Sequence, residues 1–376
     1  MNVNRKQLTV DIPAGSKQGI CLIPRINFVT KKFRRNGDDE QTAHSQGQDQ
    51  DQRQKKSHPF HYIIETMLSV IVVSYNTREV TLECLKRLSR AIEDFEDKTG
   101  SPVETIVIDN ASTDGSAAAI KKRYPKVKVL INKKNTGFAA ANNQGMAIAR
   151  GEWLLLLNSD AFVFPDTLVK MVEFTDTNPE CDVAGCQLLN QDLTLQQSWG
   201  YFPTLSRIIL FMSFIDNFPV IRKYFRAIHV RDFSRYTKTT EADWVMGAFV
   251  WLKRTVREKT GGLDEKYFMY GEETEWMYRI KKAGFKVFFT PAAKCVHLKG
   301  ASIKSMAKAF AGEAKGYIYW FSKHNPRWQQ IILPWILIFG GIYKSIAWRV
   351  LDNKEWAGAN FALSGEIWRA TFEKSR

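Results

Sequence analysis

The sequence predicts an α/β protein with a mixed, mainly parallel sheet flanked by helices, and three features indicate this fold class. Short apolar runs recur from residue 68 onward, segments of helical periodicity lie between them, and the connections are short. Parallel strands covered on both faces read as continuous apolar runs, and alternating strands and helices fold most simply through right-handed crossovers. The run from Trp153 to Leu157 has no polar side, so we expect it to form a central strand.

The predicted elements follow one another in chain order. Thr77 is a suitable N-cap residue for the first helix, and further helices are expected near 116–124, 138–150, 166–175, 272–283 and 302–324. Strands are expected at the apolar runs 68–73, 103–108, 127–131, 153–157, 182–187, 244–252 and 286–289. Residues 196–225 look like a partly apolar insertion into this alternation.

Composition divides the chain into three regions. Residues 1–66 combine basic and Gln-rich segments with little to bury, which predicts disorder without a chemical role or, alternatively, a basic arm that contacts lipid headgroups. Residues 67–302 form the predicted α/β domain, and residues 303–376 a helical region with amphipathic and apolar stretches that can associate with a membrane. A chain of 376 residues that is 44% hydrophobic can bury one large core with such an appendage.

The formal net charge of +15 restricts the partners that the chain is expected to meet. Nucleic acid and anionic membranes are the usual partners of strongly basic chains, and the sequence has no recognisable nucleic-acid-binding motif. We therefore expect an anionic membrane surface and no nucleic acid. The five cysteines are scattered without a CxxC pair and no signal-peptide core is apparent, which fits a cytoplasmic protein lying peripherally on the inner face of the cell membrane.

An apolar run at 331–343 is the candidate membrane contact. Its uncharged part is shorter than the roughly 20 residues that a spanning helix needs, and Pro334 and the Gly340–Gly341 pair are expected to interrupt it. Trp335 and Tyr343 are residue types that favour a membrane interface. The run is predicted to lie in the plane of the membrane or to re-enter it, the alternative being a buried core helix.

Polar and small residues follow the predicted strands at one edge of the sheet, where ligands of open α/β sheets bind. These residues are Ser74, Tyr75, Asn76, Asp109, Asn110, Gly137, Asn142, Asn158, Ser159 and Asp160. The Asp160 carboxylate is a hard oxygen donor suited to Mg²⁺ or Mn²⁺, although it could instead cap the next helix. Gly247 would allow a ligand to approach the backbone closely. No GxGxxG follows the first strand, which disfavours a dinucleotide-dependent dehydrogenase.

Eight short motifs in this order and spacing resemble the family-2 inverting glycosyltransferases with the GT-A fold, and among them the rhamnosyltransferases that build bacterial surface polysaccharides. They are SVIVVSYN at 69–76, VIDNASTDGS at 107–116, NTGFAAANN at 135–143, LLNSDA at 156–161, DWVMGAF at 243–249, GLDE at 262–265, FMYGEE at 268–273 and HLKGAS at 297–302. The resemblance covers residues 68 to about 302.

The resemblance implies a nucleotide-sugar donor, linked to dTDP or UDP, and a divalent metal. Tyr75 matches the residue that stacks on the nucleotide base and Asp109 the residue that hydrogen-bonds it. Asp160 matches the last carboxylate of the family's DxD motif, which binds the metal with the donor diphosphate, whereas Asn158 replaces the first Asp. His297 resembles a further metal or diphosphate ligand, the alternative being a hydrogen-bonded histidine at a strand end.

The acidic pair at 272–273 resembles the family's catalytic carboxylates. Glu273 matches the base that removes the proton from the acceptor hydroxyl, and Glu272 could orient the acceptor or raise the pKa of its neighbour. The alternative is a solvated helix start favoured by the helix dipole. Trp244 and Trp276 are the candidate acceptor-binding residues.

The resulting hypothesis is an inverting transferase that moves a sugar, with L-rhamnose from dTDP-rhamnose as the best candidate, onto a saccharide or polyprenyl-linked saccharide. One alternative is a processive polysaccharide synthase, although HNPRW at 324–328 lacks the Gln of that class's QxxRW motif. The other is a non-catalytic nucleotide-binding module, against which the acidic pair argues. The sequence does not specify the linkage or the oligomeric state.

Overall fold

The computed structural model describes residues 67–215, 218, 224–298 and 306–373, so the expectations for residues 1–66, and for Gly300 and Ser302 of the last motif, lie outside the described residues. The first half contains β1 (Leu68–Ser74), α1 (Arg78–Thr99), β2 (Val103–Asp109), α2 (Ser116–Arg123), β3 (Lys128–Ile131), α3 (Phe138–Ile148), β4 (Trp153–Asn158), β5 (Ala161–Val163), α4 (Thr167–Thr177) and β6 (Val183–Leu189). The second half contains β7 (Trp199–Gly200), α5 (Leu205–Met212), η3 (Phe233–Tyr236), β8 (Thr240–Glu241), β9 (Trp244–Val245), β10 (Phe249–Lys253), α7 (Arg254–Thr260), α8 (Glu272–Lys282), β11 (Val287–His297), α9 (Met306–His324), α10 (Arg327–Val350), α11 (Lys354–Trp368) and η4 (Arg369–Glu373).

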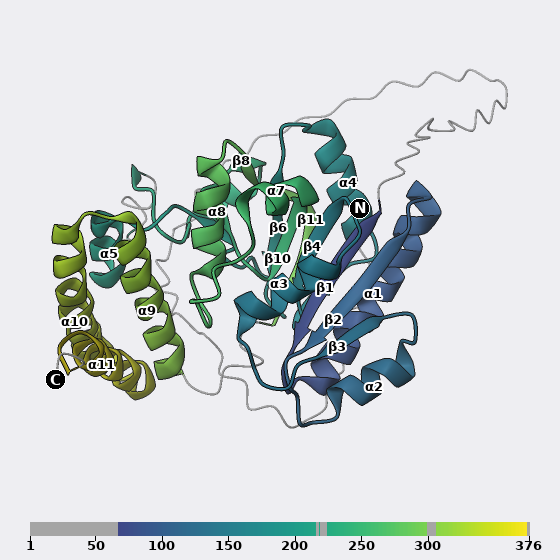
Figure 1. Cartoon of the computed structure of the whole chain (residues 1–376). Helices are drawn as coiled ribbons and strands as arrows, with labels where there is room; N and C mark the ends of the chain where they lie inside the picture. The colour runs from purple at the N-terminus through teal and green to yellow at the C-terminus, as the bar shows by residue number, and fades with distance from the viewer. Residues whose placement is uncertain (1–66, 216–217, 219–223, 299–305, 374–376) are drawn as a thin grey trace, which may run out of the picture. The chain divides into compact units, whose positions relative to one another are not determined.

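The main sheet of the described residues is mixed and mainly parallel, as predicted, with strand order β3-β2-β1-β4-β10-β6-β11-β5 and β8 paired to β11 (Figure 1). Strands β1 to β4 are parallel wherever they pair, and β4 lies inside the sheet between β1 and β10. Strand β10 runs antiparallel to both β4 and β6. The central position expected for the apolar run at Trp153 is therefore confirmed.

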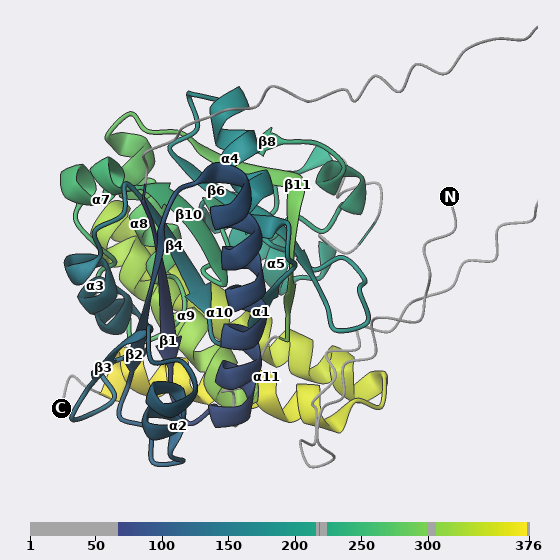
Figure 2. The ribbon, with the colours of Figure 1, turned by 90° about the vertical axis from the view of Figure 1, so that its right-hand side faces the viewer.

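Side chains of the central strands alternate between two cores on opposite faces of the sheet. Leu154 and Leu156 of β4 belong to a core with α3 and α8, whereas Leu155 and Leu157 belong to the other core with α1 and α4. Figure 2 shows α1 running along the sheet on the side opposite α3. Burial on both faces explains why these strands lack the polar-apolar alternation of a half-exposed strand.

Two predicted strands have different bounds from those expected. The strand predicted at 244–252 is broken at Met246–Ala248, because β9 pairs with β7 in a separate small sheet while β10 joins the main sheet. The strand predicted at 286–289 continues through a register shift between Thr290 and Lys294 and reaches His297. Both differences come from pairing partners distant in sequence, and both affect the site described below.

Helices α9, α10 and α11 pack against one another, and α10 also packs on α5 (Figure 1). The predicted interruption of α10 is wrong, since the helix runs unbroken through Pro334, Gly340 and Gly341. Close packing explains the glycines, because a Cβ on Gly340 would lie 2.6 Å from a side-chain carbon of Met212. Among the described helices, α10 alone has the length and apolar composition of a membrane-spanning helix.

Candidate active site

Pairing in the sheet brings the predicted polar residues to one edge. Ser74 at the end of β1 is in register with Asp109 at the end of β2, and Val73 is in register with Asn158 at the end of β4. The hydroxyl of Ser74 is buried against Thr81, at 3.0 Å, so this residue supports the edge and does not face a ligand. The edge is the carboxyl end of the parallel strands, where the sequence placed the ligand crevice.

Tyr75 and Asp109 form the part of the edge suited to a nucleoside. Tyr75 is 38% exposed, whereas Asp109 is buried. The backbone N–H of Ser112 donates to Asp109 Oδ1 at 2.9 Å, and the second oxygen, Oδ2, is buried without a hydrogen-bond partner. A buried unpaired carboxylate oxygen beside an exposed aromatic ring is a suitable acceptor for the N–H of a pyrimidine base.

Several predicted ligand residues instead hold the surrounding loops. Asn110 donates to Asn135 Oδ1 at 2.9 Å and to the carbonyl of Gly137 at 3.1 Å, and Asn76 Oδ1 accepts from the backbone N–H of Thr113 at 2.8 Å. The remaining polar contacts of this kind are those of Asn142 Nδ2 with the Phe138 carbonyl, at 3.0 Å, and of Ser159 Oγ with Thr77 Oγ1, at 3.4 Å. These side chains make hydrogen bonds within the protein and so position the edge.

Gly137 sits where a side chain would not fit. Its φ is +87°, and a Cβ there would lie 2.9 Å from the carbonyl oxygen of Phe268. The same oxygen accepts from the N–H of Phe138 at 3.1 Å. Gly137 thus joins the loop before α3 to the loop that carries the acidic pair.

Asp160 and His297 face each other at the tip of the central strand. Asp160 lies between β4 and β5, and β5 pairs with the end of β11 so that Ala161 is opposite His297. His297 Nε2 is 3.4 Å from Asp160 Oδ1, and both side chains are largely buried. The N-cap residue of α4 is Asp166, so Asp160 is not a helix cap.

Gln196 fixes the chemical state of the His297 ring. The Gln196 amide nitrogen donates to the His297 carbonyl at 3.0 Å and to Asn190 Oδ1 at 2.9 Å, which turns its oxygen toward His297 Nδ1 at 2.7 Å. Since that oxygen only accepts, Nδ1 carries the hydrogen, and in the neutral ring the lone pair is on Nε2. A nitrogen lone pair and a carboxylate oxygen then face each other.

This donor pair fits a divalent cation. An imidazole nitrogen and a carboxylate oxygen can both bind a divalent metal, and a ligating imidazole is commonly oriented by an acceptor on its other nitrogen, the place that the Gln196 oxygen takes here. Asn158 Oδ1, at the end of the same strand, is buried without a hydrogen-bond partner. The described part of the chain holds no group of three or more acidic, His or Cys side chains placed for a metal, so a bound diphosphate would have to supply further oxygens.

Glu272 and Glu273 open helix α8 on the other side of the edge. Glu272 is buried, Glu273 is half-buried, and each has an Oε2 without a hydrogen-bond partner. Burial, with the neighbouring charge of Glu273, raises the pKa of Glu272 well above its usual range. Burial also raises the pKa of Glu273, although backbone N–H groups, including that of Gly247, and the charge of His229 act in the opposite direction. A solvated helix start does not describe this pair.

Tyr270 connects the two halves of the site. Burial raises the pKa of its hydroxyl to about 12, and the charges of Glu313, Glu272, Glu273 and Asp160 add to that increase. Geometry supports the connection, because the N–H of Asn158 at the end of β4 donates to the Ala248 carbonyl at 3.1 Å, and a Cβ on the adjacent Gly247 would lie 3.7 Å from the Glu273 carboxylate.

The two tryptophans do not line an open acceptor pocket. Trp276 is 1% exposed and donates its indole N–H to the Gly261 carbonyl at 2.9 Å, so its assignment as an acceptor-binding residue is corrected to a core residue. Trp244 is also buried, and its indole N–H donates to the Tyr201 carbonyl at 3.2 Å. Its ring instead packs edge-on against His229, with ring centroids 5.2 Å apart.

Sequence reasoning did not find the residues that stand beside the acidic pair. His229 comes from the segment before η3, and Glu313 and Tyr317 come from α9. Glu313 and Tyr317 are four residues apart on a predicted helix, so they lie one turn apart on the same face. This spacing is the one local signal in the sequence for the cluster.

The sheet, with nucleoside-type and acidic residues gathered at its carboxyl edge, is that of the GT-A class of nucleotide-sugar glycosyltransferases. A mannosyltransferase from Pyrobaculum calidifontis, solved with GDP-mannose and Mn²⁺, has the same fold, with a TM-score of 0.50 at 18% identity over 82% of this chain and 87% of that chain. The family model "Glycosyl transferase family 2" matches residues 69–237. The chain is therefore a glycosyltransferase that carries a family-2 domain.

Two relatives show how far the similarity reaches. An N-acetylglucosaminyl-diphospho-decaprenol L-rhamnosyltransferase of Mycobacterium tuberculosis is 27% identical over 72% of this chain and 89% of the relative. The succinoglycan biosynthesis protein ExoO of Rhizobium meliloti is 32% identical over 34% of this chain and 33% of the relative.

Proposed function

We propose that this glycosyltransferase moves a single sugar, L-rhamnose from dTDP-rhamnose, onto a lipid-linked saccharide with inversion at the anomeric carbon, in the synthesis of a bacterial surface polysaccharide. The observation that carries the proposal is the approach of the acidic pair to the carboxyl edge of the sheet, where Asn158 donates to the Ala248 carbonyl and the adjacent Gly247 lies against Glu273. The similarity to the mycobacterial rhamnosyltransferase supports the choice of sugar and of a diphospholipid acceptor.

The donor half binds and orients the nucleotide. Tyr75 stacks on the thymine or uracil, and the unpaired Asp109 Oδ2 accepts its ring N–H. Asp160 and His297 would hold Mn²⁺ or Mg²⁺, and the bound cation supplies Lewis-acid stabilisation of the departing diphosphate. Gln196 keeps the His297 Nε2 lone pair directed at that position.

The acceptor half removes a proton. As the acceptor hydroxyl attacks the anomeric carbon from the face opposite the diphosphate, the bond to the diphosphate breaks and the hydroxyl proton passes to Glu273. A positioned carboxylate contributes on the order of 10²–10⁴-fold to such a step. Burial raises the pKa of Glu272, which favours its neutral form and lets Glu273 ionise with less repulsion from its neighbour.

The test is a donor screen with purified protein, Mn²⁺ or Mg²⁺, and an N-acetylglucosaminyl-diphospho-prenol of short chain length. We expect release of dTDP from dTDP-rhamnose and a product one sugar longer than the acceptor. A ladder of products would indicate a processive synthase. Nucleotide binding without release from any nucleotide-sugar would indicate a non-catalytic module and contradict the proposal.

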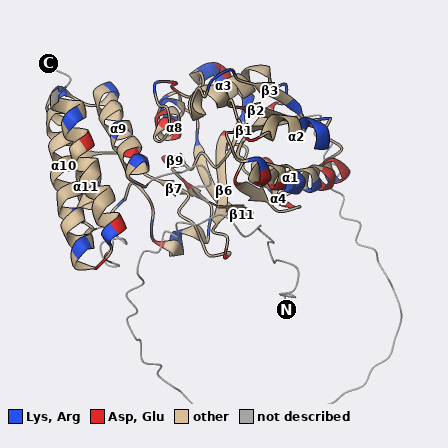
Figure 3. Ribbon diagram, turned by 90° about the horizontal axis from the view of Figure 1, so that it is seen from below, with Lys and Arg blue, Asp and Glu red and all other residues tan. Residues whose placement is uncertain are grey.

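We further propose that the enzyme lies on the cytoplasmic surface of the membrane through the outer face of α10 and α11. The exposed apolar side chains of α10 lie along one face of the helix, and they are Trp328, Ile331, Ile332, Trp335, Phe339, Ile342, Tyr343, Ile346 and Val350. Exposed Lys and Arg residues lie near the helix ends, where Figure 3 shows most of the charge on these two helices. An apolar stripe with aromatic and basic residues at its borders is suited to an anionic lipid surface.

A further inference from the structure

Helix α9 lies directly on the loop that carries the acidic pair. A Cβ on Gly316 would be 2.7 Å from the carbonyl oxygen of Tyr270, and a Cβ on Gly312 would be 2.8 Å from a ring carbon of the same residue. The loop is conformationally restricted as well, since Tyr270 has a φ of +76° and Gly271 a φ of +94°. The two glycines let the backbone of the helix approach the loop closely.

Three side chains meet at this contact. Tyr317 donates its hydroxyl to Glu313 Oε1 at 2.7 Å, and His229 Nε2 lies 3.4 Å from the same oxygen. The other carboxylate oxygen, Oε2, receives no hydrogen bond from any residue that the structure describes and is not enclosed. Glu313 and His229 are 31% and 27% exposed, so solvent reaches a cluster that lies between packed elements.

The charges of the cluster act on the acceptor half of the site. Glu313 raises the pKa of Tyr270, and His229 lowers that of Glu273. Burial would raise the pKa of Glu313, yet the hydrogen bond and charge of His229, the Tyr317 hydroxyl and the charge of Lys344 lower it to about 2. These interactions favour the ionised form of Glu313.

A second carboxylate that contacts α9, Glu275, differs from Glu313 in the number of its oxygens that are paired. Lys323 bridges Asp264 at 2.8 Å and Glu275 at 2.6 Å, and Glu275 is fully buried, with Arg279 at 2.9 Å from its second oxygen. Both oxygens of Glu275 are thus paired, one with Lys323 of α9 and the other with Arg279 of its own helix α8. Glu313 has hydrogen bonds to described residues at only one of its oxygens, and its helix packs on the loop that leads to the acidic pair.

We propose that Glu313, held by Tyr317 and His229, is the acceptor-sugar binding site of this enzyme, where the open carboxylate oxygen accepts hydrogen bonds from hydroxyls of a neutral pyranose. The inference depends on the proposed transfer reaction and adds to it the residues that hold the acceptor. A carboxylate accepts from two neighbouring hydroxyls, and the aromatic rings of Tyr270 and Tyr317 offer apolar surface to the sugar. This arrangement would present a further hydroxyl of that sugar to Glu273.

The experiment compares Glu313→Gln and Tyr317→Phe with the wild type, using dTDP-rhamnose and short-chain N-acetylglucosaminyl-diphospho-prenol as probes. Loss of a hydrogen bond to a charged group predicts a rise in acceptor KM of roughly ten- to hundredfold for Glu313→Gln and a smaller rise for Tyr317→Phe. Acceptor-independent hydrolysis of dTDP-rhamnose and the midpoint of thermal unfolding should remain those of the wild type. Glu366→Gln is the matched control, because Glu366 pairs with Lys315 of the same helix at 2.9 Å in an exposed position.

The outcomes separate the two proposals. An acceptor KM within twofold of the wild type in both variants, with a lowered unfolding temperature, would show that the cluster only attaches α9 and would overturn the inference. If the wild-type protein neither hydrolyses dTDP-rhamnose nor transfers rhamnose to the acceptor, the proposed function itself is overturned. A raised acceptor KM with unchanged donor hydrolysis supports both.

Discussion

At the scale of single residues, the site is marked by oxygen atoms that the protein leaves without a hydrogen-bond partner. Asp109 Oδ2, Asn158 Oδ1 and one oxygen of Glu273 are buried without partners. Leaving such an atom unpaired costs about 1–3 kcal/mol, so several of them at one sheet edge indicate a place built for a ligand.

The sequence predicted some of these residues better than others. Asp109 and Asp160 follow apolar strands directly, and the strand-end rule places them without further information. Gln196 and Glu313 could not be predicted in this way, since each acts through a partner more than eighty residues away that only the folded chain brings near. Trp276 was misplaced because an aromatic residue beside an acidic motif gives no indication of which face of the helix is buried.

The first residue-scale prediction concerns Gln196. Gln196→Leu removes the acceptor for His297 Nδ1, so the ring is free to rotate or to change its tautomer. We expect the affinity for Mn²⁺ in the presence of dTDP to fall about 10–100-fold, measured by electron paramagnetic resonance of free Mn²⁺. Gln187→Leu is the control, as it removes another buried amide, which bonds the Tyr236 carbonyl at 3.2 Å. Equal losses in both variants would mean that general packing, not ring orientation, is responsible.

The second prediction separates the roles of the acidic pair. Glu273→Gln should reduce kcat by about 10²–10⁴-fold, because the proton from the acceptor has nowhere to go. Glu272→Gln should keep substantial turnover, because a neutral amide imitates the protonated carboxyl. The measurement is kcat of both variants at saturating donor and acceptor. A larger loss in Glu272→Gln than in Glu273→Gln would make Glu272 the base.

The third prediction follows from the raised pKa of Glu272. A folded-state pKa above that of the unfolded chain means that the folded protein binds the proton more tightly, so the stability contributed by this group falls as pH rises above about 4.5. Glu272→Gln removes the titrating group. We expect the variant to gain stability relative to the wild type between pH 5 and pH 8, as measured by urea unfolding at both values. A difference that does not change with pH would contradict the raised pKa.

At the scale of elements, the bounds of some strands depend on their pairing partners and not on the local sequence pattern. Most helices and strands were predictable, since continuous apolar runs and helical periodicity are local signals. The break between β9 and β10 and the extension of β11 to His297 were not, because the partners of β9 and β11 lie elsewhere in the chain. The extension is what places His297 next to Asp160.

The fourth prediction tests the close packing of α9 on the loop that carries the acidic pair. Gly316→Ala introduces a Cβ 2.7 Å from a backbone oxygen that cannot move aside easily, so α9 must shift. We expect a loss of about 1–3 kcal/mol in the free energy of unfolding together with a fall in transfer activity. Gly358→Ala in α11 is the control, since a Cβ there meets nothing within 4 Å, and better helix propensity should stabilise the protein by about 0.5–1 kcal/mol. Equal changes in the two variants would exclude close packing as the cause.

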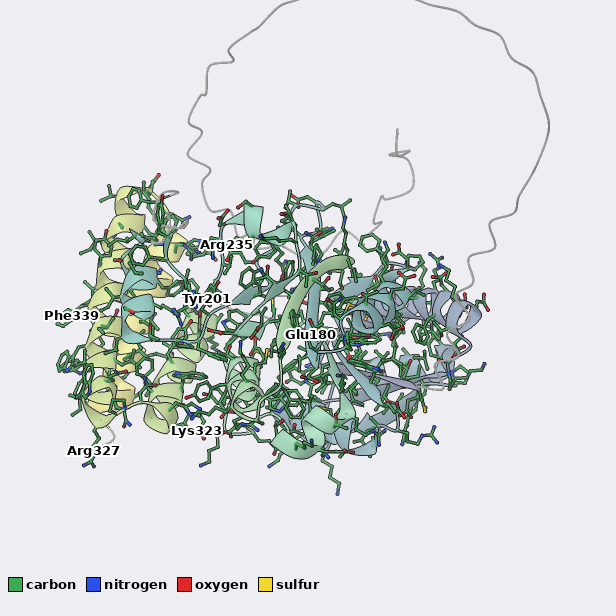
Figure 4. The ribbon with its side chains drawn as sticks, turned by 90° about the horizontal axis from the view of Figure 1, so that it is seen from above. Glu180, Tyr201, Arg235, Lys323, Arg327 and Phe339 are labelled. Atoms are coloured by element: carbon green, nitrogen blue, oxygen red, sulfur yellow. The ribbon has the colours of Figure 1, made fainter. Side chains whose placement is uncertain are left out.

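At the scale of the whole molecule, the helices next to the proposed acceptor site carry a long run of exposed apolar side chains. Helix α9 contributes Glu313 on one side, and α10 and α11 pack against α9. Figure 4 shows Phe339 on the outer side of these helices, away from the sheet. A soluble protein rarely exposes a continuous apolar stripe along a 24-residue helix unless another surface covers it. A membrane there would bring the acceptor lipid to the same group of helices that holds its sugar.

The fifth prediction is that α10 binds vesicles through this stripe. Phe339 and Ile346 are 63% and 61% exposed, so the double substitution Phe339→Ser and Ile346→Ser removes apolar contact without opening the core. Full burial of each side chain would contribute about 1.5–3 kcal/mol, and partial insertion predicts at least a tenfold loss of binding to phosphatidylglycerol vesicles, measured by flotation. Ile131→Ser is the control, because Ile131 is 50% exposed on β3 at the opposite edge of the sheet. Binding that survives the double substitution but disappears in high salt would indicate attraction by charge alone. A wild-type dimer that becomes monomeric in the variant, without vesicle binding in either, would show that a second copy of the chain covers the stripe instead.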